Sequence, residues 1–167
     1  TRRSIAFVCF SAEEKGLQGS RAFVANPPFD LSNVAAMVNL EMLGRPEKEG
    51  PPFAWVTGKE LSDFAAIAGT ALERAGVALT EFEMASRLFS ASDNLPFAQA
   101  GVVAHSISAG TLHSDYHQPG DEPSRIDVPH MTAVLAGLAE VVAEFANRDA
   151  RPVYTPEAAE RLGGTRR

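Results

Sequence analysis

The sequence is poor in cysteine and in basic residues, and these shortages exclude several classes of protein. A single cysteine, Cys9, excludes an internal disulfide framework and a cysteine-cluster metal site. Its apolar neighbours predict a small buried side chain. The net charge of -6 argues against a nucleic-acid partner, because phosphates require a basic surface. We expect no membrane span, because charges interrupt the longest apolar stretches.

The chain also starts without an initiator methionine or a signal peptide, at Thr1. We therefore expect a segment of a longer protein. Its 167 residues, 45% hydrophobic and 22% charged, are typical of one globular domain. We expect this domain to occupy residues 1–150, with residues 151–167 as a polar tail.

Apolar runs and helical periodicity alternate along the sequence. The patterns predict strands at residues 4–10, 34–43, 53–57, 77–84 and 102–108, and helices at residues 17–24, 60–75, 92–100, 128–147 and 156–162. Strands that alternate with helices indicate a layered α/β domain with a mixed or mostly parallel sheet. In such sheets the chemistry gathers in loops beyond the carboxyl ends of the strands.

Carboxylates stand where two of the apolar runs end or are interrupted. Glu13 and Glu14 follow the first run and have two interpretations: a solvated loop, or a metal ligand beside a general base. Glu41 interrupts the second run, where burial of an unpaired charge would be costly. A metal ion or another cation would serve as its partner.

The loop at residues 113–117 gathers imidazole, carboxylate and phenol groups within five positions. A lone histidine in a surface loop usually has no function, but zinc readily takes imidazole nitrogen and carboxylate oxygen. His105 within a predicted strand and His130 on the last predicted helix are better explained as structural residues.

Four segments in this order resemble the signature blocks of metallopeptidase family 28. They are SIAFVCFSAEEKGLQGS (residues 4–20), VNLEMLGR (38–45), SDNLPFAQAGVVAHSISAG (92–110) and HSDYHQPGDEPSRID (113–127). The family includes secreted bacterial aminopeptidases, glutamate carboxypeptidases and glutaminyl cyclases. The resemblance implies a three-layer αβα sandwich with a mixed, mostly parallel sheet, here N-terminally truncated.

The resemblance also implies a role for five residues. Glu13 matches the general base, and Glu14 and His117 match the ligands of one zinc ion. Glu41 matches the acidic ligand of a second zinc ion. Tyr116 matches the phenol that hydrogen-bonds the oxyanion. In addition, Asp93 and Asp121 fall on recurrent acidic positions, where we expect supporting or structural roles.

The sequence departs from the family pattern in three places. Glu41 stands where Asp is more common, and Asn94 replaces the histidine of a Ser-Asp-His block. The upstream His-x-Asp, which supplies a zinc ligand and the bridging carboxylate, has no counterpart before Thr1. His113 and Asp115 have the same spacing but lie in a different block.

The implied function is a zinc-dependent exopeptidase, an aminopeptidase in the first instance, with two zinc ions and a peptide or aminoacyl substrate. A glutaminyl-cyclase-like acyltransferase with one zinc ion is the alternative enzyme. A non-catalytic interaction module with the peptidase fold is the alternative outside enzymes. The family's secreted members suggest a periplasmic or extracellular protein, and we expect these residues alone to be inactive.

Overall fold

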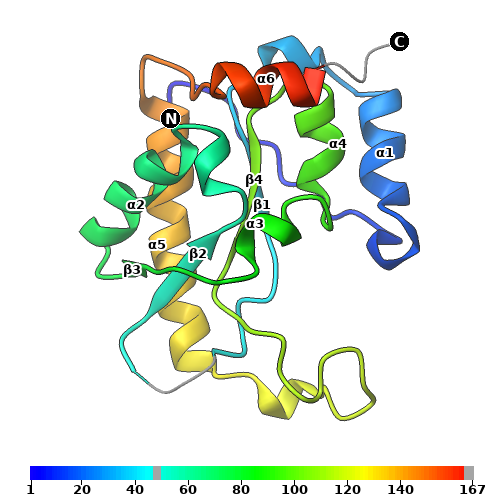
Figure 1. Cartoon of the computed structure of the whole chain (residues 1–167). Coiled ribbons are helices and arrows are strands. Elements are labelled where there is room, and N and C mark those ends of the chain that lie inside the picture. Colours follow the sequence, from blue (N-terminus) through cyan, green and yellow to red (C-terminus); the bar gives the residue numbers. More distant parts are fainter. Residues whose placement is uncertain (47–49, 164–167) are drawn as a thin grey trace.

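The computed structural model describes residues 1–46 and 50–163 and has a four-stranded mixed sheet at its centre (Figure 1). The strands are β1 (Met37–Leu40), β2 (Phe53–Val56), β3 (Ala78–Leu79) and β4 (Ala104–Ser108), in the order β1-β4-β2-β3. The β1–β4 and β2–β3 pairs are parallel, whereas β2 and β4 are antiparallel.

Helices cover both faces of this sheet, as the resemblance implies (Figure 1). The helices are α1 (Gln18–Ala25), α2 (Phe64–Arg74), α3 (Ala85–Leu88), α4 (Asn94–Gln99), α5 (Val128–Asn147) and α6 (Pro156–Gly163). Short 3-10 turns lie at Glu13–Lys15, Leu31–Asn33, Lys59–Leu61 and Pro123–Arg125. One hydrophobic core joins α2 and α5 to the sheet, and a second joins α4 and α6 to it, with α1 packed alongside. The αβα layering is therefore confirmed.

Helix α5 begins and ends where its sequence pattern predicts. Asp127 caps it by accepting a hydrogen bond from the His130 backbone N–H at 2.9 Å. Its buried face carries Val134, Leu138, Val141 and Phe145 at helical spacing. By length and composition alone α5 could cross a membrane. Its apolar stripe is instead buried in the first core, as in the core helix of a folded domain.

The strand predicted at residues 4–10 is wrong. These residues are described and form no strand, and Phe7 is 90% exposed. Cys9 is exposed as well, contrary to the expected burial. A strand needs a neighbour for its backbone hydrogen bonds, and residues 4–10 pair with none of the strands β1–β4 in the described chain. It is held at Arg3, whose backbone N–H donates to the Ala146 carbonyl at 3.0 Å.

Other predicted boundaries change as well. The strand predicted at residues 34–43 is reduced to the four residues of β1, which pair with β4. Residues 77–84 yield only the two-residue strand β3, because the chain then turns into α3. The helix predicted at residues 60–75 splits into a 3-10 turn and α2, with Ser62 between them bridging to Tyr154. Ala158 and Leu162 of α6 are buried in the second core, so residues 151–163 pack on the domain. Residues 164–167 of the expected tail lie outside the described residues.

Candidate metal centre

The turn that carries Glu13 and Glu14 is folded by its own backbone. Ala12 adopts φ 56° and Leu17 φ 60°, both left-handed, and Gly16 closes the turn at φ 91°. The Gly16 backbone N–H donates to the Glu13 carbonyl at 3.0 Å, and the side chain of Leu17 is buried beneath. The two adjacent carboxylates therefore project from a tight turn between residue 10 and α1.

Left-handed backbone recurs at the other predicted ligands. Met42, directly after Glu41, has φ 50°, and His117 itself has φ 59°. Such conformations in non-glycine residues cost on the order of 1 kcal/mol or more and persist where the surroundings enforce them. At Met42 the surroundings include Gly110, where a Cβ atom would lie 2.3 Å from the Met42 carbonyl oxygen. Only glycine permits this close approach beyond the end of β4.

Glu14 and His117 meet, although 103 residues separate them. The Nε2 atom of His117 lies 2.7 Å from Oε1 of Glu14, and both side chains are more than half exposed. The Tyr116 ring stacks on the His117 ring, with centroids 3.9 Å apart. The fold thus gathers the first predicted zinc pair and the predicted oxyanion donor at the carboxyl end of the sheet.

Electrostatic coupling links these residues to Glu13 and Glu41. Partial burial raises the pKa of Glu13, and the negative charges of Glu14, Asp93 and Glu41 raise it further, while His117 lowers it. Burial also raises the pKa of the Tyr116 phenol, with added contributions from Glu14, Glu13 and Glu41. A raised carboxyl pKa suits a general base, and a raised phenol pKa keeps that group protonated as a donor.

The remaining acidic residues have separate partners. Oδ1 of Asp93 accepts a hydrogen bond from Oγ of Ser20 at 2.5 Å, and Asp93 is buried. Asp93 precedes α4, but its side chain makes no capping bond among the described residues. Asp121 lies in a different contact, an ion pair with Arg45 at 2.8 Å. Arg45 also binds Asp115 at 2.9 Å, so this arginine ties two points of the 113–121 loop to the end of β1.

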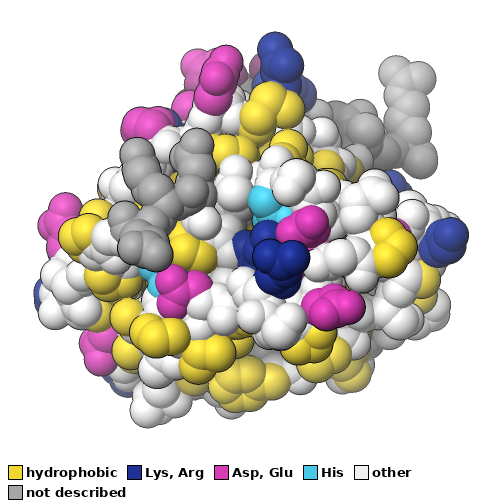
Figure 2. Space-filling model, turned by 90° about the horizontal axis from the view of Figure 1, so that it is seen from below, with side chains coloured by type: hydrophobic (Ala, Val, Ile, Leu, Met, Phe, Trp, Pro, Cys, Tyr) yellow, Lys and Arg dark blue, Asp and Glu magenta, His cyan; other side chains and the backbone are white. Residues whose placement is uncertain are grey.

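A hollow of about 260 Å³ lies between these groups. Glu14, Tyr116 and His117 line one side of it, and Arg45 and Asp121 line another. Figure 2 shows this end of the molecule, where basic, acidic and histidine side chains gather near the middle of the face. The hollow therefore borders the predicted zinc ligands Glu14 and His117 and the predicted oxyanion donor Tyr116.

The donor set fits a zinc ion in part. Glu14 and His117 offer the oxygen and nitrogen that zinc takes, close enough to share one ion. Within residues 1–46 and 50–163, however, no group of three or more such side chains is arranged to hold a metal. Glu41 makes a separate contact, in which its Oε2 accepts a hydrogen bond from Oγ of Ser92 at 2.6 Å. These donors alone therefore make an incomplete site.

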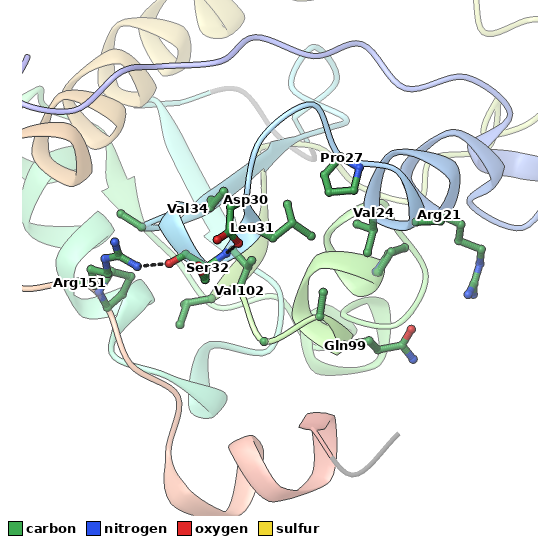
Figure 3. Close-up of a pocket in the computed structure, with 17 residues that line it drawn as sticks. Arg21, Val24, Pro27, Asp30, Leu31, Ser32, Val34, Gln99, Val102 and Arg151 are labelled. Carbon is green, nitrogen blue, oxygen red and sulfur yellow. Dashed lines mark hydrogen bonds between the residues drawn. The ribbon is translucent and has the colours of Figure 1, made fainter. Parts of the chain in front are cut away.

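A larger hollow, of about 890 Å³, lies at the opposite end of the sheet. Its floor is apolar and includes Val34 and Val102, and Arg151 closes one side by donating to the Ser32 carbonyl at 2.6 Å (Figure 3). Among the residues described there, none belongs to the predicted site. The larger of the two hollows is therefore separate from the predicted metal centre.

The polar side chains that connect to Glu41 were not predicted from the sequence. Asn39 donates to Oγ of both Ser92 and Ser106, each at 2.9 Å. A signal was available, because Asn39 interrupts the same apolar run as Glu41 and lies two residues before it, on the same face of the strand. Arg45, which organises the neighbouring loop, carried no comparable pattern.

The sequence matches peptidase family M28 over residues 1–142. The chain belongs to peptidase family M28. No curated protein matches the sequence closely enough to count as a relative.

Solved structures share the fold of this M28 chain. A zinc aminopeptidase from Bacillus subtilis superposes with a TM-score of 0.66 at 23% identity, over 86% of this chain and 36% of its own. The LapA aminopeptidase of Legionella pneumophila gives 0.72 at 19% identity, over 84% and 38%. An aminopeptidase from Aneurinibacillus sp. strain AM-1 gives 0.63 at 23% identity, over 88% and 34%. The chain thus spans about a third of the length of these structures.

Proposed function

We propose that this M28 chain carries the catalytic carboxylate and part of the metal site of a zinc-dependent exopeptidase, and that the whole protein is an aminopeptidase. The observation that carries the proposal is the contact between Glu14 and His117, 2.7 Å apart, with Glu13 adjacent and Tyr116 stacked on the histidine. The family match and the zinc aminopeptidase among the structural neighbours support the same reaction class.

Glu14 and His117 would hold one zinc ion, and Glu41 would contribute to a second. Zinc, when bound, polarises the scissile carbonyl and lowers the pKa of water. The Glu13 carboxylate takes a proton from the attacking water and returns it to the leaving amine. Glu13 is suited to this role by its position, because it adjoins the proposed ligand Glu14 in the same turn. The Tyr116 hydroxyl, kept protonated by its raised pKa, donates a hydrogen bond to the developing oxyanion.

The incomplete donor set leads to a second part of the proposal. The 167 residues alone bind zinc weakly, because the described donors offer one close pair and a separate carboxylate. Calorimetry or elemental analysis of the isolated chain tests this. Tight binding of two zinc ions by these residues would contradict it.

The decisive test of the reaction uses the whole protein and three substrates. We expect release of amino acids from chromogenic aminoacyl anilides, abolished by a chelator and restored by zinc. N-acylated peptides test for carboxypeptidase activity, and peptides with N-terminal glutamine test for cyclisation. Turnover of either in place of the anilides rejects the aminopeptidase assignment. Absence of all three activities in zinc-loaded protein supports a non-catalytic module.

A further inference from the structure

A continuous path of side-chain hydrogen bonds leads from Glu41 into the interior. Ser92 Oγ donates to Glu41 Oε2 at 2.6 Å, and Asn39 Nδ2 donates to Ser92 Oγ at 2.9 Å. Asn39 Nδ2 also donates to Ser106 Oγ at 2.9 Å, and Ser106 Oγ donates to Asn94 Oδ1 at 3.0 Å. Ser92, Asn94 and Ser106 are buried, so bulk water does not compete for these bonds.

The direction of every bond in this path is fixed by its inner end. Asn94 Nδ2 lies 3.0 Å from the Phe89 backbone carbonyl, which can only accept, so the Asn94 amide oxygen must face Ser106. Ser106 therefore gives its proton to Asn94 and accepts from Asn39. The Asn39 amide uses its two hydrogens on Ser106 and Ser92. Ser92 accepts from Asn39, which leaves its own proton for Glu41.

The fold builds this path from three elements. Asn39 and Glu41 point to the same side of the chain because they are two residues apart on and just beyond β1. Asn39 lies opposite Ser106 in the parallel register of β1 and β4. Ser92 and Asn94 come from the start of α4, which packs on β4. A shift of one residue in the β1 register would break the path.

We infer that Asn39, Ser106 and Asn94 are positioning residues that act through Ser92 to fix the Glu41 carboxylate for a divalent cation. The inference rests on the proposed function, in which Glu41 is a zinc ligand. Ser92 holds Oε2 with a donated hydrogen bond, and this contact restrains the rotation of the carboxylate. Glu41 is thereby offered to a cation as a carboxylate of restrained orientation.

The inference also gives a reason for Asn94, which stands where the family pattern has histidine. An asparagine offers one acceptor and two donors and does not titrate. The carbonyl of Phe89 orients it, and its oxygen then sets the direction of all the bonds that follow. Neither this amide nor the backbone carbonyl titrates, so the hydrogen-bond directions at the inner end of the path are fixed by geometry alone.

The test is zinc titration of the whole protein, with wild type compared with Ser92→Ala and Asn39→Leu. Ser92→Ala removes the donor to Glu41, and Asn39→Leu removes both amide donors without touching Glu41. We expect each to weaken the binding of one of the two zinc ions by roughly 10-fold to 100-fold, the usual effect of losing an outer hydrogen bond to a ligand. The affinity for the other zinc ion should stay unchanged.

Two further variants separate positioning from folding. Ser92→Thr keeps the hydroxyl and should restore zinc affinity to near the wild-type value. Ser90→Ala removes an exposed hydroxyl two residues away that contacts only the Arg87 carbonyl among its described partners, and should leave both zinc affinities unchanged. Thermal unfolding of the zinc-free variants reports any purely structural effect.

The outcomes distinguish this inference from the proposed function. If wild type binds two zinc ions and both variants bind them as tightly, with only the zinc-free stability reduced, the positioning role is overturned while the metallopeptidase proposal stands. If wild type itself fails to bind two zinc ions, the proposed function fails and this inference fails with it.

Discussion

His105 and His117 lie in two regions that use the same side chain in opposite ways. His105 is completely buried between aromatic rings, and both of its nitrogens have partners. Nδ1 lies 2.7 Å from the Thr57 carbonyl, which only accepts, so Nδ1 carries the proton and Nε2 accepts from the Ser62 hydroxyl at 2.7 Å. His117 is half exposed and contacts a carboxylate from a distant turn.

The two environments suit different roles, a structural one for His105 and the proposed role of a metal ligand for His117. The His105 region is closed, satisfied and neutral, because burial lowers the pKa of the imidazole to about 4. The His117 region is open, has left-handed backbone and gathers several negative charges around Glu13. A side chain that binds a metal or a substrate must be accessible and must have a lone pair or proton to offer. A side chain that stabilises the fold can instead be buried with all of its hydrogen bonds made. The predictions below test this contrast.

The largest expected effect is in the open region. Glu13→Gln in the whole protein should lower turnover by a factor of about 10² to 10⁴, because the amide cannot accept the proton. Zinc content should remain near wild type, since Glu13 is not among the proposed ligands. Initial rates on aminoacyl anilides, together with elemental analysis, check both parts. Near-normal turnover in this variant would show that Glu13 is not the general base.

Alanine substitutions of His105 and His117 should have opposite effects on stability and on zinc affinity. His105→Ala should lower the free energy of unfolding by about 3 kcal/mol, because it leaves a cavity, removes the donor to the Thr57 carbonyl and removes the acceptor of the Ser62 hydroxyl proton. His117→Ala should change stability by less than about 1 kcal/mol, since its pair is exposed. Zinc affinity should move the other way, falling for His117→Ala and holding for His105→Ala. Urea unfolding and zinc titration of both variants measure the contrast.

The third prediction concerns pH. The pKa of His105 is about 4 in the folded protein against 6.5 as its ordinary value, so the unfolded chain binds the proton more readily. The stability contribution is present in full above pH 6.5 and is lost as pH falls from 6.5 towards 4, by about 3 kcal/mol over that window. His105→Gln should flatten this slope. The free energy of unfolding of both proteins is measured between pH 4 and pH 7. If it falls with pH as much in the variant as in the wild type, other groups cause the pH dependence.

The smallest effect is expected at Cys9, in the segment of residues 4–10 that was wrongly predicted to be a strand. Cys9→Ser in the 167-residue chain should change the free energy of unfolding by less than about 0.5 kcal/mol, because Cys9 is exposed. Thiol labelling of the native chain should be fast, again because of exposure. Slow labelling, together with a decrease in the free energy of unfolding of more than about 1 kcal/mol, would show that Cys9 is buried.

Prediction from sequence succeeds here where the determining contacts are local. The boundaries of α5 follow from an Asp127 cap and an apolar stripe, and both are written within the helix itself. Prediction fails at residues 4–10, because an apolar run favours burial but a strand also requires a neighbouring strand to pair with. At the candidate site the predicted residues were found by pattern, but Asn39 and Ser92 were not, because their importance lies in contacts with distant residues.

The sequence by itself determined the family, the layered α/β class and the identities of the candidate site residues, since motifs and periodicity are properties of neighbours in the chain. Only the tertiary structure decided that Glu14 and His117 touch, that Arg45 pairs with Asp115 and Asp121, and that Ser92 holds Glu41. The physical reason is that a hydrogen bond or ion pair depends on distances of a few ångströms between groups, and sequence separation does not encode those distances.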